Sequence, residues 1–476
     1  MIRIDEGLTP SSLREPIRRM WELSAAKIAA LDARRQPGDG APVFTCEGRY
    51  TSRGWTEWTQ GFCFGSMILQ FDADGDAAML ELGRQRIRRH MAPHVTHMGV
   101  HDHGFNNIST YGALWRLMNE KRIKEEEYLR DFLEMALACS GAVQARRWTE
   151  TRDVGGFIYS FNGPHSLFSD TIRSLRSLAV AHLLGHVLME ERDTPVSLLQ
   201  RLADHAIATV KYNVYYGEGR DAYDVPGRVA HEGIFNVNDG SYRCPSTQQG
   251  YSPFTTWTRG LAWVLLGCAE QLEFLDTLPE EQFEALGALP HCPGAAQDAG
   301  ARDTLAAWLE RAALATAERV IRSSTADGVM PWDTGAPGLA QTPGWDQRDS
   351  DPTGACEPFD SSASAIAAQG LVRLGVRRTA QGHADGARFL AAGLTVTRTL
   401  LGPAYLSPKG HEGLLLHSVY HRPNGWDHIP EGRGIPCGES SMWGDYHLRE
   451  LALLLQRMDR GEPYLTFFGP ARPLGQ

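Results

Sequence analysis

Apolar residues recur at helical spacing along almost the whole chain, and this periodicity limits the fold more than any other feature of the sequence. It predicts about twelve helices, which cover Ser11–Asp32, Thr59–Phe71, Asp76–Met91, Ile108–Asn119, Lys124–Cys139, Leu167–Met189, Pro195–Tyr212, Phe254–Glu273, Arg302–Ser323, Ser361–Leu374, Asp385–Leu401 and Met442–Arg457. No break in composition divides the 476 residues. Twelve helices without such a break fit six helical hairpins in one toroid, an all-α (α/α)6 barrel that spans residues 1–476 as a single domain. Two separate helical bundles are the alternative.

The loops between the predicted helices carry the glycine, proline and aromatic residues, and in a toroid the loops at one end form the pocket. Pro226–Pro253 is predicted to contain a β-hairpin, because Asn238-Asp239-Gly240 is a typical turn sequence. Met330–Phe359 and Leu406–Ser441 are further loop-rich stretches. We therefore expect the functional residues in or beside these loops.

Charge and cysteine content narrow the range of partners. The net charge of −10 argues against nucleic acid, because no basic field is available to replace counterions. An anionic small substrate needs only a local positive patch and stays possible. None of the eight cysteines forms a CxxC pair, so we expect a reducing compartment, the cytoplasm. Residues 1–19 lack the apolar core of a signal peptide, and no apolar run is long enough to span a membrane.

Two acids are the strongest candidates for chemistry. Asp102 lies in His101-Asp102-His103-Gly104-Phe105, and Asp170 lies in Phe168-Ser169-Asp170-Thr171. A carboxylate beside an imidazole, with a second carboxylate elsewhere in the same pocket, forms an acid/base pair. Each acid alone has a structural alternative, because an Asp before a helix is commonly an N-cap. Aromatic neighbours and the other carboxylate are expected to raise the pKa of Asp170.

The histidines around Asp102 resemble a metal site only superficially. His94, His97, His101 and His103 are close together in sequence, but they follow no regular ligand spacing and lie in a loop. We therefore predict polar recognition by some of these imidazoles, and neither a metal nor another cofactor.

Aromatic and polar side chains elsewhere are typical of a sugar pocket. Trp55 and Trp58 stand at the entry to a helix, and indoles are faces on which sugar rings stack. Arg259 and Trp263 share a helix face, and Arg259 can grip a carboxylate in a bidentate manner. Core packing is the alternative for each Trp, and a structural salt bridge is the alternative for Arg259. For Asp360, before Ser361, we favour an N-cap over catalysis.

Taken together, these motifs resemble the unsaturated glucuronyl hydrolases, glycoside hydrolase family 88. The resemblance runs from about Trp58 to the last predicted helix, and the matching pieces occur in the order of the family. They are Glu57-Trp58-Thr59-Gln60-Gly61-Phe62, His101-Asp102-His103-Gly104-Phe105, Asp170, Gln249-Gly250, Trp257-Thr258-Arg259-Gly260-Leu261-Ala262-Trp263, Trp332-Asp333, Asp360-Ser361-Ser362-Ala363 and Trp443-Gly444-Asp445-Tyr446. The family fold is an (α/α)6 barrel, which agrees with the helix count.

The resemblance implies an unusual reaction on a terminal uronic acid with a C4=C5 double bond. In the family an Asp protonates C4 of this vinyl ether, water adds at C5, and the resulting hemiketal rearranges so that the glycosidic link breaks. Asp170 matches the acid/base residue, and Asp102 matches the second essential carboxylate. The implied substrate contacts are Trp58, His101, Arg146, His231, Gln248, Gln249, Trp257, Arg259 and Trp263.

Two departures from the family pattern bear on the choice of sugar. Gln248-Gln249-Gly250 stands where the family commonly has His-Gln-Gly. Gln144-Ala145-Arg146 stands where it often has Gln-Ala-Trp. The segment from Tyr215 to Arg228 also looks longer than usual. These changes alter charge and stacking near the sugar.

The expected substrate is therefore an unsaturated uronyl oligosaccharide left by a polysaccharide lyase, with no nucleic acid or membrane partner and an oligomeric state that the sequence leaves open. Three alternatives remain. The same barrel hydrolyses a saturated glucuronide, it hydrolyses an unsaturated rhamnogalacturonan fragment, or it binds sugar without turnover.

Overall fold

The computed structural model describes residues 1–36, 38–52 and 58–469, and these divide into two compact units built from alternating stretches of chain. Unit 1 comprises Met1–Gln85, Thr247–Ala262 and Ala317–Leu465. Unit 2 comprises Arg86–Ser246, Trp263–Thr316 and the chain from Thr466. Trp55 and Glu57, which belong to a motif of the sequence, lie outside the described residues. The single domain over 1–476 stays a prediction.

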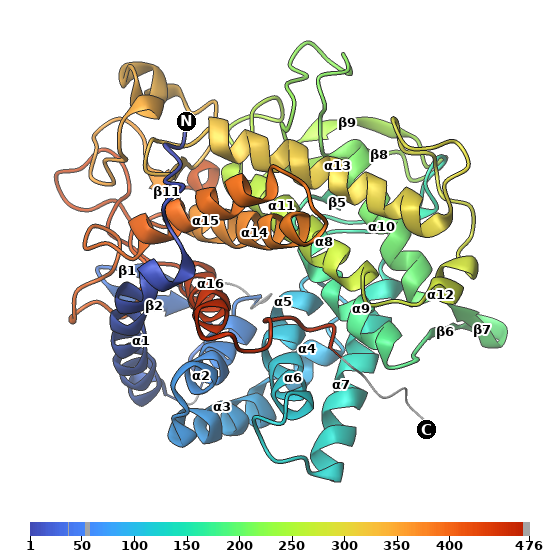
Figure 1. Cartoon of the computed structure of the whole chain (residues 1–476), viewed down its shortest axis with the longest axis horizontal. Helices are drawn as coiled ribbons and strands as arrows, with labels where there is room; N and C mark the ends of the chain where they lie inside the picture. Colours follow the sequence, from blue (N-terminus) through green and yellow to red (C-terminus); the bar gives the residue numbers. More distant parts are fainter. Residues whose placement is uncertain (37, 53–57, 470–476) are drawn as a thin grey trace. The chain divides into compact units, whose positions relative to one another are not determined.

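Unit 1 is built from long helices with short strand pairs in its loops (Figure 1). Its helices are η1 (Pro10–Leu13), α1 (Arg14–Arg34), α2 (Gln60–Asp74), α3 (Ala77–His90, whose end belongs to unit 2), η4 (Pro337–Gln341), η5 (Trp345–Gln347), α14 (Ser361–Ala380), α15 (Gly386–Leu400), η6 (Arg422–Asn424) and α16 (Met442–Arg460). Its strands form two antiparallel pairs, β1 (Pro42–Cys46) with β2 (Arg49–Ser52) and β10 (Met330–Pro331) with β11 (Phe359–Asp360). Helix α14 packs against both α15 and α16, and α16 packs against α2.

Small residues explain why α14 and α15 lie so close. A Cβ at Gly375 would approach the backbone nitrogen of Leu390 to 2.5 Å, and one at Gly393 would approach the carbonyl oxygen of Ala368 to 2.9 Å. Asp360 begins α14 as a true N-cap, since its carboxylate accepts from the backbone N–H of Ser362 and Ala363. The expectation of an N-cap at Asp360 is confirmed.

Unit 2 mixes helices with short strands. Its helices are α4 (Ala92–Val95), α5 (His103–Asn107), the π-helical turn η2 (Ile108–Gly112), α6 (Ala113–Asn119), α7 (Glu127–Arg146), α8 (Thr171–Ser174), α9 (Arg176–Leu183), η3 (Glu191–Asp193), α10 (Leu198–Tyr212), most of α11 (Thr258–Leu275), α12 (Glu280–Glu284) and most of α13 (Ala301–Arg322). Its strands are β3 (Trp148–Glu150), β4 (Gly156–Ile158), β5 (Ser166–Phe168), β6 (Leu188–Glu190), β7 (Thr194–Val196), β8 (Glu232–Phe235) and β9 (Tyr242–Ser246). They pair antiparallel as β3–β4, β6–β7 and the three-stranded sheet β5-β8-β9.

Each of the twelve predicted helices has a counterpart, and two of them need a correction. The predicted helix Pro195–Tyr212 begins only at Leu198, because Pro195 and Val196 belong to strand β7. The predicted helix Leu167–Met189 is shorter at both ends, because Leu167 pairs with Gly233 in a strand and Leu188 pairs with Val196 in another. Leu167 to Ala181 is buried almost throughout, and a run that is apolar on all sides has no periodicity to separate strand from helix. At the other end Leu188 is buried between the exposed Val187 and Met189, an alternation typical of a strand. The predicted hairpin is confirmed as β8 and β9, with Gly240 at a φ of +68° in the turn.

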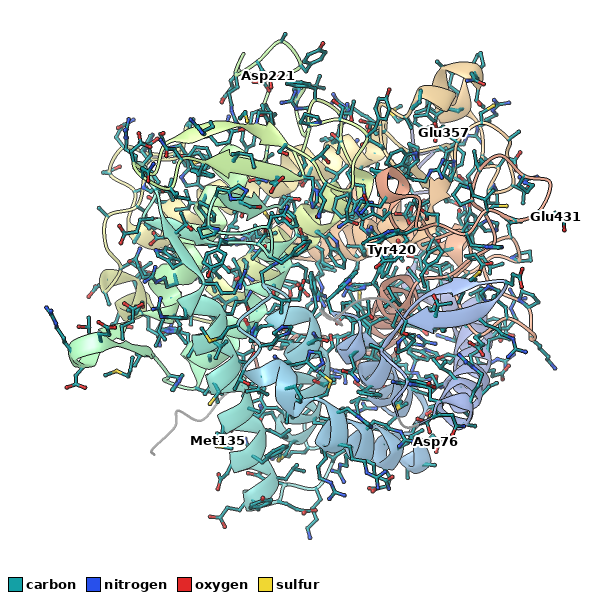
Figure 2. The ribbon with its side chains drawn as sticks, turned by 180° about the vertical axis from the view of Figure 1, so that it is seen from behind. Asp76, Met135, Asp221, Glu357, Tyr420 and Glu431 are labelled. Atoms are coloured by element: carbon teal, nitrogen blue, oxygen red, sulfur yellow. The ribbon has the colours of Figure 1, made fainter. Side chains whose placement is uncertain are left out.

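The segment from Tyr215 to Arg228 forms an outlying but well-tied loop, and Asp221 lies near its outer end (Figure 2). The Asp224 carboxylate accepts from the backbone N–H of Gly217, Glu218 and Arg220. Arg228 pairs with Asp221 at 2.6 Å. These hydrogen bonds and this ion pair stabilise the loop, which has little apolar packing of its own. Among the described helices, none is long and apolar enough to cross a membrane.

A buried ion pair joins α2 to α16 in unit 1 and offers a test of the fold. Arg457 donates to both carboxylate oxygens of Asp72 at 2.8 Å, and both side chains are buried. Asp72→Ala should lower the free energy of unfolding by about 3–5 kcal/mol, because it leaves an uncompensated buried guanidinium. Urea denaturation measures this loss, and the exposed pair Arg18–Glu22 serves as the control, since Glu22→Ala should barely move the midpoint. Equal effects of the two substitutions would contradict the account.

Candidate acid/base site

Asp102 and Asp170 meet at one buried histidine in unit 2. His101 Nε2 lies 3.2 Å from Asp170 Oδ2 and 3.7 Å from Asp102 Oδ1. His101 is 1% exposed, Asp102 6% and Asp170 9%. The structure therefore brings together the two acids that the sequence singles out, with His101 in contact with both.

Each acid stands at the N-cap position of a short helix, yet neither caps it. Asp102 precedes α5 and Asp170 precedes α8, and neither side chain accepts a hydrogen bond from its helix. The backbone explains this, because Asp102 (φ −91°, ψ 18°) and Asp170 (φ −74°, ψ −21°) lack the extended conformation of capping residues. Both carboxylates are thereby available to His101. The structural alternative for Asp170, a side-chain cap, does not hold.

A third side chain reaches Asp170 from the neighbouring strand. His231 Nε2 lies 3.9 Å from Asp170 Oδ1, and the His231 ring packs 4.4 Å from the ring of Phe168. The pairing of β5 with β8 places these residues together, because Phe168 faces Glu232 and Ser169 N–H donates to the carbonyl of His231. His231 is thus beside the acids, where the family resemblance puts it.

The three groups shift one another's protonation. Burial raises the pKa of Asp102, and the nearby Asp170 adds to this while His101 opposes it. Burial also acts to raise the pKa of Asp170, but the hydrogen bond and charge of His101 and the charge of His231 outweigh it, so that the pKa is lowered. Burial acts to lower the pKa of His101, and the two carboxylates reverse the direction. The expectation of a raised pKa at Asp170 is wrong, because His101 and His231 lower the pKa of Asp170, and it is Asp102 whose pKa is raised.

The other histidines of this loop have structural partners. His103 Nδ1 lies 2.9 Å from Ser140 Oγ, and its Nε2 lies 3.1 Å from the carbonyl oxygen of His97. His94 Nδ1 lies 3.1 Å from Asn106 Nδ2. Burial lowers the pKa of both His94 and His103 to about 4. The imidazoles of His94 and His103 thus contact Asn106 and Ser140, whereas the charge of His97 acts on Asp102 and opposes the rise of its pKa.

Among the described residues, one group of His, Cys, Asp and Glu side chains is compact enough to hold a metal ion. It consists of His101, Asp102 and Asp170, whose ligand atoms lie within 4.8 Å of one another. In this structure the same atoms form the ion pairs of the acid site. The expectation of a site that works without a metal stays a prediction.

Two side chains near the acids were missed by sequence reasoning. Arg146 is exposed at the end of α7, whereas the next residue, Arg147, is 5% exposed and acts electrostatically on Asp102. Arg147 donates to the carbonyl oxygens of Met98, Tyr159 and Ser160. Phe161 lies parallel to the His101 ring at 5.9 Å and is 41% exposed. No local sequence pattern distinguishes Arg147 from Arg146. The two arginines differ in burial because only one side of the helix end faces the core.

Unit 1 gathers the predicted residues around Arg259. Its guanidinium donates to the carbonyl oxygens of Val419 and Tyr420 and to Gln249 Oε1, at 3.1, 2.8 and 2.7 Å. It lies between the rings of Trp257 and Trp443, 4.7 and 4.6 Å from their centroids. The structure therefore gives Arg259 a structural role and lets it orient the amide of Gln249. A structural salt bridge, the alternative expected for this residue, stays a prediction.

The remaining predicted contacts divide between the two units. In unit 1, Trp58 stacks on Trp443 at 5.1 Å, Trp257 is buried, and Gln248 and Gln249 are half-buried. In unit 2, Trp263 is 2% exposed and packs 5.0 Å from the ring of Phe105. Their roles as sugar contacts stay predictions.

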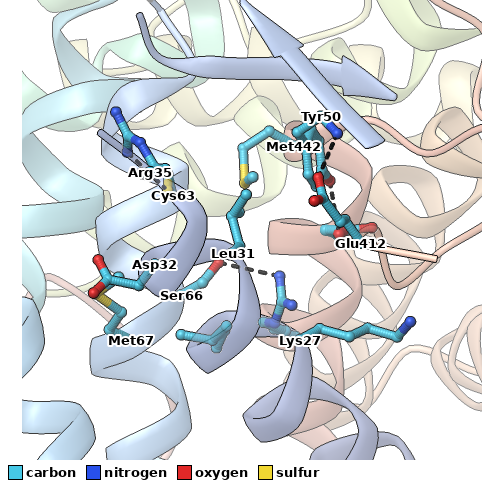
Figure 3. Close-up of a pocket in the computed structure, with 13 residues that line it drawn as sticks. Lys27, Leu31, Asp32, Arg35, Tyr50, Cys63, Ser66, Met67, Glu412 and Met442 are labelled. Atoms are coloured by element: carbon cyan, nitrogen blue, oxygen red, sulfur yellow. Dashed lines mark hydrogen bonds between the residues drawn. The ribbon is translucent and has the colours of Figure 1, made fainter. Parts of the chain in front are cut away.

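A small cavity in unit 1 is lined mainly by side chains of α1, α2 and α16 (Figure 3). Lys27 donates to the carbonyls of Pro408 and His411, and Asp445 accepts from Leu414 N–H, Leu415 N–H and Tyr50 Oη. The space open to a water-sized sphere is about 20 Å³, which holds one water and no sugar. The side chains of Lys27 and Asp445 therefore hold the loop 408–415 in place, and the cavity is too small to be a substrate site.

The shared histidine makes a specific prediction. Asp170→Asn removes a hydrogen bond and a negative charge from His101, so the pKa of His101 should fall below its value in the unaltered protein. NMR titration of the His101 imidazole measures this. Asp204→Asn is the control, since Asp204 is a buried acid on α10 that accepts from Gln200 and does not contact His101. An unchanged His101 pKa in Asp170→Asn would contradict the geometry.

A largely helical chain that buries two carboxylates on one histidine beneath a half-exposed aromatic ring has the features of a sugar-processing hydrolase. Comparison with curated proteins makes this more specific. The chain is 26% identical over 450 residues to an unsaturated glucuronyl hydrolase of Bacillus sp. (strain GL1), covering 92% of this chain and 97% of the relative. It is 25% identical over 418 residues to an unsaturated chondroitin disaccharide hydrolase of Streptococcus pyogenes serotype M1, covering 86% and 84%. No protein-family model matches the chain.

Solved structures agree in fold. An unsaturated glucuronyl hydrolase specific for heparin superposes with a TM-score of 0.69 at 16% identity, covering 94% of this chain and 98% of that chain. The enzyme from Bacillus sp. GL1 gives 0.66 at 22% identity, covering 95% and 100%. The comparisons confirm the predicted resemblance to unsaturated glucuronyl hydrolases, the all-α (α/α)6-barrel fold class and the prediction of a hydrolase.

Proposed function

We propose that this protein removes a terminal 4,5-unsaturated uronic acid from oligosaccharides by hydrating the vinyl ether. The observation that carries the proposal is the convergence of Asp102 and Asp170 on His101, with neither acid capping its helix. The relatives support the substrate class, since their names are unsaturated glucuronyl hydrolase and unsaturated chondroitin disaccharide hydrolase. One related structure, from Streptococcus agalactiae, is a complex with dGlcA-GalNAc6S.

In the proposed reaction Asp170 acts first as acid and then as base. Its proton adds to C4, and the positive charge that develops is shared by C5 and the ring oxygen. Water then bonds to C5 and returns a proton to the Asp170 carboxylate, which regenerates the acid. The hemiketal at C5 opens to a ketone, and the hemiacetal at C1 breaks down to release the remaining sugar as an alcohol. One water molecule is consumed.

The protonation of the site sets a condition on this step. In the ligand-free protein His101 and the charge of His231 favour the carboxylate form of Asp170. The uronate carboxylate of the substrate brings a further negative charge, and a like charge raises the pKa of a neighbouring acid. We propose that substrate binding moves a proton held by the His101–Asp102 pair to Asp170. Asp102 would then balance the charge of His101 during the reaction.

The remaining parts of the proposal concern binding and location. Trp58, Arg146, Gln248, Gln249, Trp257, Arg259 and Trp263 are predicted substrate contacts, and Phe161 joins them because one ring face is exposed beside His101. Arg259 orients the amide of Gln249 by donating to its Oε1. A cytoplasmic location is supported by the eight cysteines, all described and none in a disulfide.

Asp170→Asn tests the catalytic role. The substitution should reduce the rate of loss of the enol-ether absorbance of a lyase-generated unsaturated disaccharide by about a hundredfold to ten-thousandfold, the usual contribution of a positioned acid. Asp204→Asn, which alters a buried acid away from His101, should retain activity. A substantial rate in Asp170→Asn would remove Asp170 from the chemistry.

A substrate panel separates the alternatives. The unsaturated uronyl disaccharide should be consumed, and a saturated aryl glucuronide should not, because it has no double bond to protonate. Consumption of an unsaturated rhamnogalacturonan fragment alone, or of the saturated glucuronide, would redirect the assignment within the same barrel. Calorimetric binding without any turnover would mark a sugar-binding protein.

A further inference from the structure

A single buried hydroxyl holds the backbone on both sides of Asp102. Ser174 Oγ donates to the carbonyl oxygen of His101 at 2.8 Å and accepts from Gly104 N–H at 2.8 Å. It also accepts from Gln144 Nε2 at 3.0 Å. A hydroxyl has one hydrogen to donate and two lone pairs, so these three bonds use its whole capacity and fix its rotation.

Gln144 completes the clamp from α7. Its Nε2 donates to the same His101 carbonyl at 2.9 Å, and its Oε1 accepts from Ser177 Oγ. Gln144, Ser174 and Ser177 are all buried. The amide is therefore held at both ends, and the peptide group that precedes Asp102 receives two hydrogen bonds in a region closed to water.

The clamp explains why Asp102 does not cap its own helix. An N-cap residue accepts from the second or third helical N–H, and in α5 the second is Gly104 N–H. Ser174 Oγ already occupies that N–H, and the grip on the His101 carbonyl keeps Asp102 at a ψ of 18°, away from the extended region. Gly104 permits the approach, because a Cβ there would overlap the backbone of Ser174.

We propose that Ser174 is a positioning residue that keeps the Asp102 carboxylate on His101 by replacing it as the cap of α5. Ser174 ends α8, the short helix that Asp170 begins, so one helical turn carries both the acid and the clamp for its partner. The spacing of the two carboxylates then depends on this hydroxyl. The catalytic part of the inference rests on the proposed function, whereas the placement of Asp102 does not.

A crystal structure of Ser174→Ala tests the placement. Gly104 N–H loses its acceptor in this variant, so Asp102 should take the extended backbone conformation and its carboxylate should move to within hydrogen-bond distance of Gly104 N. Asp102 still at 3.7 Å from His101, with ψ near 18°, would overturn the proposal whatever the activity of the protein.

Kinetics on an unsaturated disaccharide test the consequence. Ser174→Ala should lower kcat by about tenfold to a hundredfold, the usual cost of displacing a catalytic group by about 1 Å, with little change in KM. In an Asp102→Asn background the same substitution should cost almost nothing, because it acts through Asp102. Additive losses, or a loss confined to KM, would contradict the proposal, and no turnover by the unaltered protein would instead refute the proposed function.

Ser197→Ala is the matched control. Ser197 Oγ accepts from Gln200 N–H and caps α10 in the ordinary way, without contact with the acids. Its removal costs an exposed helix cap and should leave kcat unchanged. A loss of kcat equal to that of Ser174→Ala would mean that any lost cap in this unit slows the enzyme, and the proposal would fail.

Discussion

The contact of one buried imidazole with two carboxylates is the interaction on which this account depends. His101 alone would lose its charge on burial, and Asp102 alone would hold its proton. Together with Asp170 they form a set of three groups whose protons are shared, so none of them has a protonation state of its own. Such a set can pass a proton from one member to another, which is what an acid that later serves as a base requires.

Several hydrogen-bonded elements of unit 2 keep these three side chains in position. The strand pair β5–β8 fixes Asp170 beside His231, Arg147 ties the loops of Met98 and Ser160 together, and the Gln144–Ser174 clamp sets the backbone of Asp102. In unit 1, Arg259 plays a comparable part for Gln249, since its three hydrogen bonds reach two carbonyl groups and one amide. In both units a buried, hydrogen-bonded polar side chain keeps another side chain in position.

Much of the fold and of the site could be predicted from the sequence, and the misses have physical causes. Helical periodicity predicts the helices because most of them bury one face. It fails at Leu167, where burial is uniform, and at Leu188, which is buried between the exposed Val187 and Met189. The sequence singles out Asp102 and Asp170 together, but it does not separate them from helix caps, because Asp360 has the same position before a helix and does cap it. The backbone angle ψ distinguishes Asp102 and Asp170 from Asp360, and tertiary contacts set this angle. The direction in which the pKa of Asp170 shifts depends on His101, which is 69 residues away in the sequence. A local sequence pattern does not reveal such a contact.

In the proposed reaction the double bond is protonated at C4 in the step that frees the sugar. The most direct measurement is the reaction of an unsaturated uronyl disaccharide in D₂O, followed from its first moments by NMR and mass spectrometry. We predict that each released uronic acid gains one deuterium at C4 and loses the enol-ether absorbance at the same rate as the second sugar appears. Release of a uronic acid that keeps its double bond, with no deuterium at C4, would contradict the account.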